Sequence, residues 1–125
     1  MRTPIFWILK GHKPVACRSA LEWALWCSTH EQDRFVKRDI ICDTQVAVST
    51  IFVGINLDLH RGPPLLFESM VFGGALDLTR QRYTTWAAAE AGHTVMLTNA
   101  QLSGVRVTPA ETGVTLTCPG GTGSM

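Results

Sequence analysis

The chain has 125 residues, of which 46% are apolar and 17% are charged, and its formal net charge is +1. This composition predicts one globular domain and excludes a disordered chain. The basic excess that nucleic-acid-binding proteins gather on one face is missing, so nucleic acid is not an expected partner.

The sequence predicts neither a membrane span nor an export signal. The longest nearly uncharged run, residues 44–57, has 14 residues and is too short to cross a bilayer. The apolar stretch at residues 3–10 is too short for the apolar core of a signal peptide. The protein is therefore expected in the cytoplasm, with its widely spaced cysteines as reduced thiols. These cysteines are Cys17, Cys27, Cys42 and Cys118.

The first part of the chain predicts a short hairpin and then a helix. Apolar residues 5–9 suit a strand, Gly11 breaks it, and residues 14–16 return alongside. Ser19 is placed to cap the helix that follows, and Glu22, three residues later, completes a capping box.

The faces of this helix suggest where a partner binds. One face suits packing on a sheet and consists of Leu21, Ala24, Leu25 and Ser28. Trp23 and Trp26 then lie on the outer side, as anchors for a protein partner or for a second copy of the chain. The alternative is that the hairpin, which carries Trp7, folds over both indoles.

Three antiparallel strands are predicted next, at residues 35–40, 46–53 and 65–72. Their β-branched and aromatic content suits a sheet. Pro63 and Pro64 cannot donate to a strand ladder, so they precede the third strand. Residues 73–82 are expected to form a turn and a loop.

A second helix is predicted over residues 83–97, with Thr84 or Thr85 as its cap. Four of its residues form a stripe at helical spacing: Trp86, Ala89, His93 and Met96. Gly92 is unfavourable in a helix interior, so it indicates a close approach of another segment.

These elements predict an α+β fold, with a small antiparallel sheet of three to five strands and two helices packed on one face. Residues 1–98 form the expected domain. Residues 99–125 are a polar C-terminal extension, interpreted as a weak hairpin followed by a frayed tail.

Residues 48–93 resemble a segment shared by a family of small, uncharacterised proteins of tailed phages and prophages. The resemblance rests on "VSTIFVG", "GPPLLFESMVFGG", "RYTTW" and a helix that ends in Gly92-His93. It implies a viral origin, the cytoplasm of a bacterial host as location, and a shared fold. It implies no activity, because the family has none assigned.

Glu68 is the most unusual polar residue, a carboxylate inside an apolar strand. We interpret it as paired within the fold, with Arg82 or with the Tyr83 hydroxyl. The alternative is a small enzyme or ligand-binding domain that uses Glu68 with His60 and His93.

His93 and His60 also have interpretations that need no catalysis. His93 is expected to be packed on the sheet and bonded to a backbone carbonyl. His60 lies in a loop beside Arg61, and this pair suits contact with a protein partner.

No cofactor or metal is expected. The one ligand set that zinc would accept is His12, Cys17, Cys27 and His30. Cys17 and Cys27 lie at opposite ends of the predicted first helix, about 15 Å apart by its rise per residue, so zinc is not predicted. Nucleophile, phosphate-loop and dinucleotide motifs are absent from the sequence.

Two functions follow from these observations. The first is a small non-enzymatic phage or prophage accessory protein that binds a host or viral protein, for example to inhibit a host defence such as CRISPR interference. The second is the small enzyme or ligand-binding domain described above. Convergence of Glu68, His60 and His93 in a pocket would favour the second.

Overall fold

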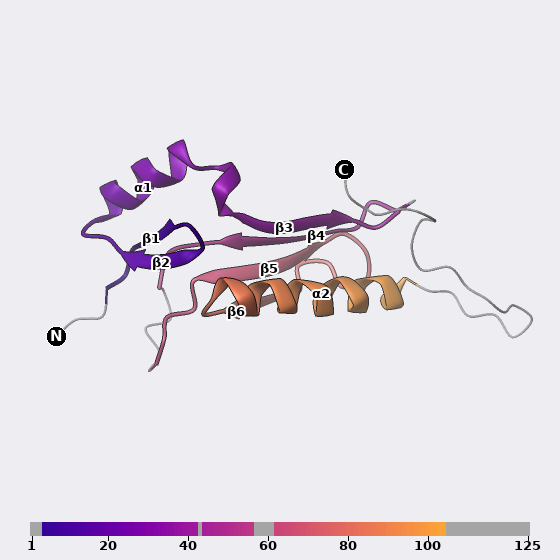
Figure 1. Ribbon diagram of the computed structural model, residues 1–125. Helices are drawn as coiled ribbons and strands as arrows, with labels where there is room; N and C mark the ends of the chain where they lie inside the picture. Colours follow the sequence, from indigo (N-terminus) through magenta and orange to yellow (C-terminus); the bar gives the residue numbers. More distant parts are fainter. Residues whose placement is uncertain (1–3, 43, 57–61, 105–125) are drawn as a thin grey trace, which may run out of the picture.

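The computed structural model describes residues 4–42, 44–56 and 62–104. Within these residues the structure has two helices and two antiparallel sheets (Figure 1). The strands are β1 (Trp7–Lys10), β2 (Lys13–Ala16), β3 (Phe35–Ile40), β4 (Ala47–Phe52), β5 (Phe67–Phe72) and β6 (Arg80–Tyr83). The helices are α1 (Ala20–Thr29) and α2 (Trp86–Ser103), with a short 3-10 turn, η1 (Gln32–Arg34), after α1. The predicted α+β class and small antiparallel sheet are confirmed.

The main sheet is a four-stranded meander in the order β3-β4-β5-β6. Strands β3, β4 and β5 are the three that the sequence predicts. Strand β6 is an addition, because residues 73–82 were expected to be a loop. Its sequence, RQRY, is polar and lacks the alternation that marks a half-buried strand, so only pairing with β5 reveals it.

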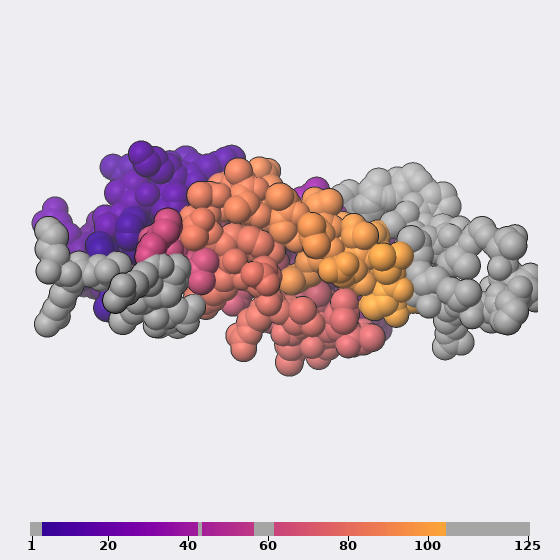
Figure 2. Space-filling model, turned by 90° about the horizontal axis from the view of Figure 1, so that it is seen from below, coloured from indigo at the N-terminus to yellow at the C-terminus, as the bar shows by residue number. Residues whose placement is uncertain are grey.

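Helix α2 runs below the sheet and packs on its four strands (Figure 1). Figure 2, seen from below, shows α2 and the segment before it forming much of this side of the molecule. Thr85 caps the helix by accepting a hydrogen bond from the backbone N–H of Ala88 at 3.0 Å. The helix extends to Ser103, so the predicted domain boundary at residue 98 falls inside it.

The predicted stripe of α2 is confirmed. Ala89, His93 and Met96 are buried, and Ala100 continues the stripe. Gly92 marks the close approach that the sequence indicated, since a Cβ atom there would lie 2.1 Å from the ring of Tyr83.

Helix α1 packs against β1 rather than on the main sheet, which differs from the expectation of two helices on one face. Its predicted start is confirmed, because Ser19 Oγ accepts from the backbone N–H of Glu22 at 3.1 Å. Glu22 in turn accepts from the backbone N–H of Arg18, at 2.9 Å, in a variant of the capping box. The β1-β2 hairpin is confirmed as well.

The hairpin is joined to the end of β4. The backbone N–H of Trp7 donates to the Gly54 carbonyl at 2.8 Å, and Phe6 bridges Ile55. Gly54 has a φ of +75°, and a Cβ atom there would lie 2.6 Å from the Trp7 carbonyl oxygen. Glycine is therefore needed where the hairpin approaches β4.

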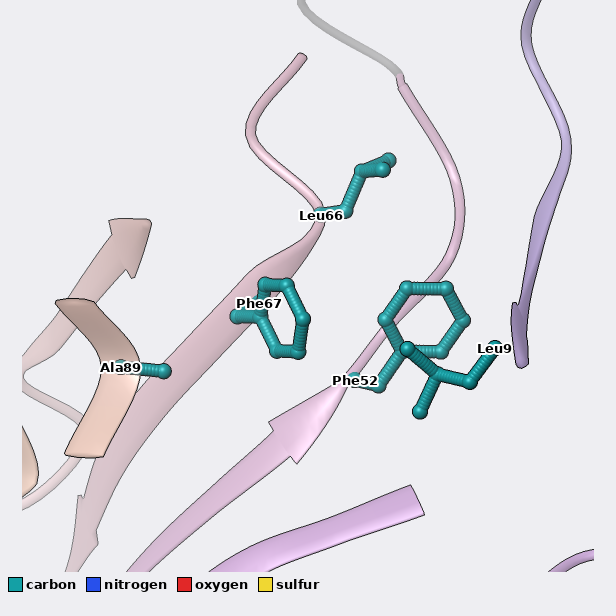
Figure 3. Packing of buried hydrophobic residues seen from close by; sticks show 5 residues of the cluster. All are labelled: Leu9, Phe52, Leu66, Phe67 and Ala89. Atoms are coloured by element: carbon teal, nitrogen blue, oxygen red, sulfur yellow. The ribbon is translucent and has the colours of Figure 1, made fainter. Parts of the chain in front are cut away.

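Apolar packing connects the hairpin, the sheet and α2. The Phe67 ring lies between Ala89 of α2 and the Phe52 ring, and Phe52 in turn approaches Leu9 of the hairpin (Figure 3). The Phe52 and Phe67 centroids are 5.2 Å apart in an edge-on arrangement. A second cluster, further along α2, consists of Ile41, Val48, Val71, Met96 and Ala100.

The cysteines and the helices bear on two of the predictions made from the sequence. Cys42 is disulfide-bonded, so the prediction of reduced thiols is wrong for this residue, and Cys118 lies outside the described residues. Within the described ranges, neither helix combines the length and the apolar character needed to cross a membrane.

Candidate functional site

The main sheet has two faces that differ in what covers them. Residues on the face toward α2, the inner face, are fully buried at Val48, Phe52, Phe67 and Val71. The opposite face, which we call the outer face, carries the alternate residues of the same strands. None of the described helices packs extensively on it.

The strand register places the outer-face residues in rows that run across the sheet. The rows are Ile40-Ala47-Phe72, Arg38-Ser49-Met70-Arg80 and Phe35-Ile51-Glu68-Arg82. Apolar side chains thus occupy much of the centre, and arginines lie on both edge strands. Phe72 is 46% exposed, which is high for an aromatic side chain in a sheet.

Glu68 lies on the outer face and forms an ion pair with Arg82. The distance from Arg82 Nε to Glu68 Oε2 is 3.1 Å, and the two side chains are 23% and 14% exposed, respectively. The predicted pairing within the fold is therefore confirmed, with Arg82 as the partner. Tyr83 points to the inner face instead, where its ring lies over Gly92.

The other two arginines of the outer face lack such a partner. In the described part of the chain, Arg82 alone of the three forms an ion pair with a carboxylate. The Arg38 guanidinium lies 5.3 Å from the centroid of the Phe35 ring, a distance typical of a cation–π contact. The strands of this face therefore carry more positive than negative charge.

A hollow opens at one end of the outer face, between η1 and the sheet. It has a volume of about 310 Å³ and is lined by Glu31, Gln32, Arg34, Phe35 and Ile51. Its apolar lining comes from β3 and β4, and one carboxylate and one guanidinium line it as well. A hollow of this size fits a large apolar side chain of a partner.

His93 belongs to the inner face and is wholly buried. Its Nε2–H donates to Asp39 Oδ2 at 2.8 Å, and its Nδ1 lies 2.6 Å from Thr50 Oγ1. Thr50 in turn lies 2.5 Å from Ser69 Oγ. The prediction of a backbone-carbonyl partner is therefore wrong, because two side chains on the facing strands, Asp39 and Thr50, supply the hydrogen bonds to His93.

The hydrogen-bond network of Asp39, His93, Thr50 and Ser69 has the residue types of a catalytic triad, yet its burial argues for a structural role. Thr50, Ser69 and His93 are each 0% exposed, so no substrate reaches the hydroxyl groups. With Nε2–H donating to Asp39, Thr50 donates to Nδ1 and Ser69 donates to Thr50. Each hydroxyl and both ring nitrogens of this hydrogen-bond network then have a partner, as a stable buried network requires.

The enzyme hypothesis required Glu68, His60 and His93 to converge. Glu68 and His93 lie on opposite faces of the sheet. His60 and Arg61 lie outside the described residues, so their suggested contact with a partner stays a prediction. The described members of the constellation therefore do not form a common pocket.

Helix α1 is rotated relative to the prediction. Trp23 Nε1 donates to the Val53 carbonyl at 3.2 Å, and Trp26 lies edge-on to Phe52 at 5.8 Å. Leu21 and Leu25 are instead 69% and 59% exposed. Trp23 and Trp26, with Cys27, cover the junction between hairpin and sheet, where Trp23 also lies against Phe6. The outward direction is therefore wrong, and the alternative, in which both indoles are covered at the hairpin, is the arrangement found. The signal that was missed is their spacing of three and four residues, which places all three on one side.

A groove of about 530 Å³ lies beside this junction, lined partly by His12, His30, Trp26, Trp86 and Asp33. His12 is stacked on Trp86 with centroids 3.6 Å apart, and His30 Nδ1 donates to the Trp26 carbonyl at 2.9 Å. Among the described residues, no group of three or more His, Cys, Asp or Glu side chains is placed to hold a metal ion. The expected absence of zinc stays a prediction.

The two free cysteines, Cys17 and Cys27, belong to this end of the molecule. Burial raises the pKa of both thiols above the usual value, and the carboxylate of Glu22 adds to the rise at Cys17. Both thiols are therefore poor nucleophiles near neutral pH.

Comparisons of the chain with protein-family models, with curated proteins and with solved structures find no match.

Proposed function

We propose that this protein acts by binding another protein through its outer face, without catalysing a reaction. The observation that carries the proposal is the open outer face with its apolar centre. A sheet is normally stabilised by covering its apolar face with a second layer. Here α2 covers the inner face, and the described part of the chain supplies no second layer for the outer face.

The hollow beside η1 supports the same proposal. Interfaces between proteins derive much of their binding energy from a few large side chains that enter pockets. The hollow is lined by Phe35 and Ile51 and continues the apolar centre of the outer face. A partner would thus gain both a flat apolar contact and one anchored side chain.

The partner proposed is a host or viral protein, in keeping with the resemblance to phage and prophage proteins. Inhibition of a host defence system, such as CRISPR interference, is one form that this function takes. The competing enzyme proposal has less support, because Glu68 is engaged by Arg82 and lies on the other side of the sheet from His93.

Site-specific photocrosslinking tests the proposal. A photoreactive amino acid is placed at Phe72 on the outer face, at Val95 on α2, or at Leu25 on α1. These positions are 46%, 60% and 59% exposed, so exposure alone does not favour the outer face. Each variant is irradiated in a bacterial extract, and the adducts are compared.

A discrete adduct from position 72 that position 95 does not give is the expected result. Adducts from position 25 alone would move the binding surface to α1. The absence of a distinct adduct at position 72 would contradict the proposal.

A further inference from the structure

We propose that the segment docking on the outer face is an amphipathic helix with acidic residues along both of its long sides. This inference rests on the proposed function, since it names the chemistry of the partner at the same face. It is carried by the pattern of charge and by the dimensions of the sheet.

Arginines stand on the two edge strands, with apolar residues between them. Arg38 lies on β3 and Arg80 on β6, in the same cross-strand row as Ser49 and Met70. Three strand spacings separate them, which is roughly 14 Å. An α-helix with its side chains is about 10–12 Å wide, so it fits along the strands between the two arginines.

The length of the sheet agrees with a short helix. Strands β4 and β5 have six residues each, which corresponds to about 20 Å. A helix of three to four turns has the same length. An apolar stripe on that helix would meet Ile51, Met70 and Phe72, and one large side chain near its end would enter the hollow beside η1.

The arginines at the edges of the outer face determine which residues should flank the apolar stripe of the docking helix. Docking removes water from the rim of the face, so each arginine there gains from a carboxylate opposite and loses from a cation. Glu68 already neutralises Arg82, whereas Arg38 and Arg80 have no carboxylate partner in the described part of the chain. The matching helix therefore carries Glu or Asp on both sides of its apolar stripe.

Two other occupants fit the charges of the outer face less well. A second copy of the chain would place its own edge arginines against those of the first, and like charges at an interface cost free energy. Residues 105–125 contain one acidic side chain, Glu111, and one basic side chain, Arg106. That segment does not supply acidic residues for both edges.

Two designed helical peptides with the same apolar stripe test the inference. One carries glutamate along both sides of the stripe, and the other carries lysine at the same positions. Binding of each labelled peptide to the full chain is measured by fluorescence anisotropy at low and at high salt. The test variant is Arg38→Gln/Arg80→Gln.

The matched control is Lys37→Gln/Arg18→Gln, which removes the same charge from elsewhere. Lys37 shares a cross-strand pair with Thr50, so it belongs to the other side of β3, and Arg18 lies before α1. We expect the glutamate peptide to bind about tenfold more tightly than the lysine peptide at low salt. The preference should disappear in the test variant and at high salt, and persist in the control variant.

The outcomes separate this inference from the proposed function. Equal binding of both peptides, lost in Phe72→Ser, would overturn the acidic helix and keep the protein-binding face. A crosslinked protein at position 72 without binding of either peptide would do the same. Failure of both the peptides and the crosslink would overturn both proposals. Arginine-dependent binding of a single-stranded oligonucleotide, at the expense of the peptide, would replace the protein partner with nucleic acid.

Discussion

The two faces of the four-stranded sheet are made by alternate residues of the same strands, yet they differ in burial and in charge. The inner face is closed, with phenylalanine and valine at the ends and a satisfied polar chain in the middle. The outer face is partly exposed, with an apolar centre and arginines at its edges. The comparison suggests that inner residues determine stability and outer residues determine binding.

The largest expected difference is between two phenylalanines of one strand. Phe67 is 0% exposed on the inner face, whereas Phe72 is 46% exposed. Phe67→Ala should lower the free energy of unfolding by about 3–5 kcal/mol, because it opens a cavity between Phe52 and α2. Phe72→Ala should cost less than about 1 kcal/mol. Urea unfolding measures both, and similar losses would remove the distinction between the faces.

Disturbing the hydrogen-bond network of the inner face should give the second-largest loss of stability. His93→Leu leaves Asp39 and Thr50 without their partner beneath α2, and we expect a loss of about 2–3 kcal/mol. Asp39→Asn keeps an acceptor for His93 Nε2, so it should cost only about 1 kcal/mol. A His93→Leu protein as stable as the wild type, measured by thermal unfolding, would show that the network is dispensable.

The contact between α2 and β6 should give a smaller change in stability, and whether that change is a loss or a gain tests the close approach. Gly92→Ala would improve helix propensity by about 1 kcal/mol, but its Cβ would collide with the Tyr83 ring. We expect a net loss of about 1–2 kcal/mol. In a Tyr83→Leu background the same substitution should cost less or stabilise. Calorimetry of the four proteins in this cycle tests that coupling, and simple additivity would argue against the close approach.

The ion pair of the outer face should contribute least. Glu68 and Arg82 are partly exposed, so solvent screens their interaction. Glu68→Gln should therefore lower stability by about 1 kcal/mol or less, and the loss should shrink at high salt. Chemical denaturation at two salt concentrations is the measurement. A loss as large as that of His93→Leu would mean that the outer face is stabilised like the inner one.

The sequence by itself determined the elements whose signals are local. Ser19, and Thr84 or Thr85, marked helix starts because a side-chain oxygen there can accept from a free backbone N–H nearby, and the structure selects Thr85. Gly92 indicated a close approach because glycine is otherwise unfavourable inside a helix. Glu68 suggested an ion pair because a carboxylate in an apolar strand requires a partner.

Tertiary structure decided everything that depends on which segments meet. The polar sequence of β6 becomes a strand only because β5 offers it free hydrogen-bonding groups. Helix α1 turns its tryptophans inward because the end of β4 offers both of them a partner, the Val53 carbonyl for Trp23 and the Phe52 ring for Trp26. His93 finds Asp39, 54 residues away in the chain, only when α2 lies across the sheet. The open outer face has the same origin, because alternation along a strand defines two faces and only packing determines which one is covered.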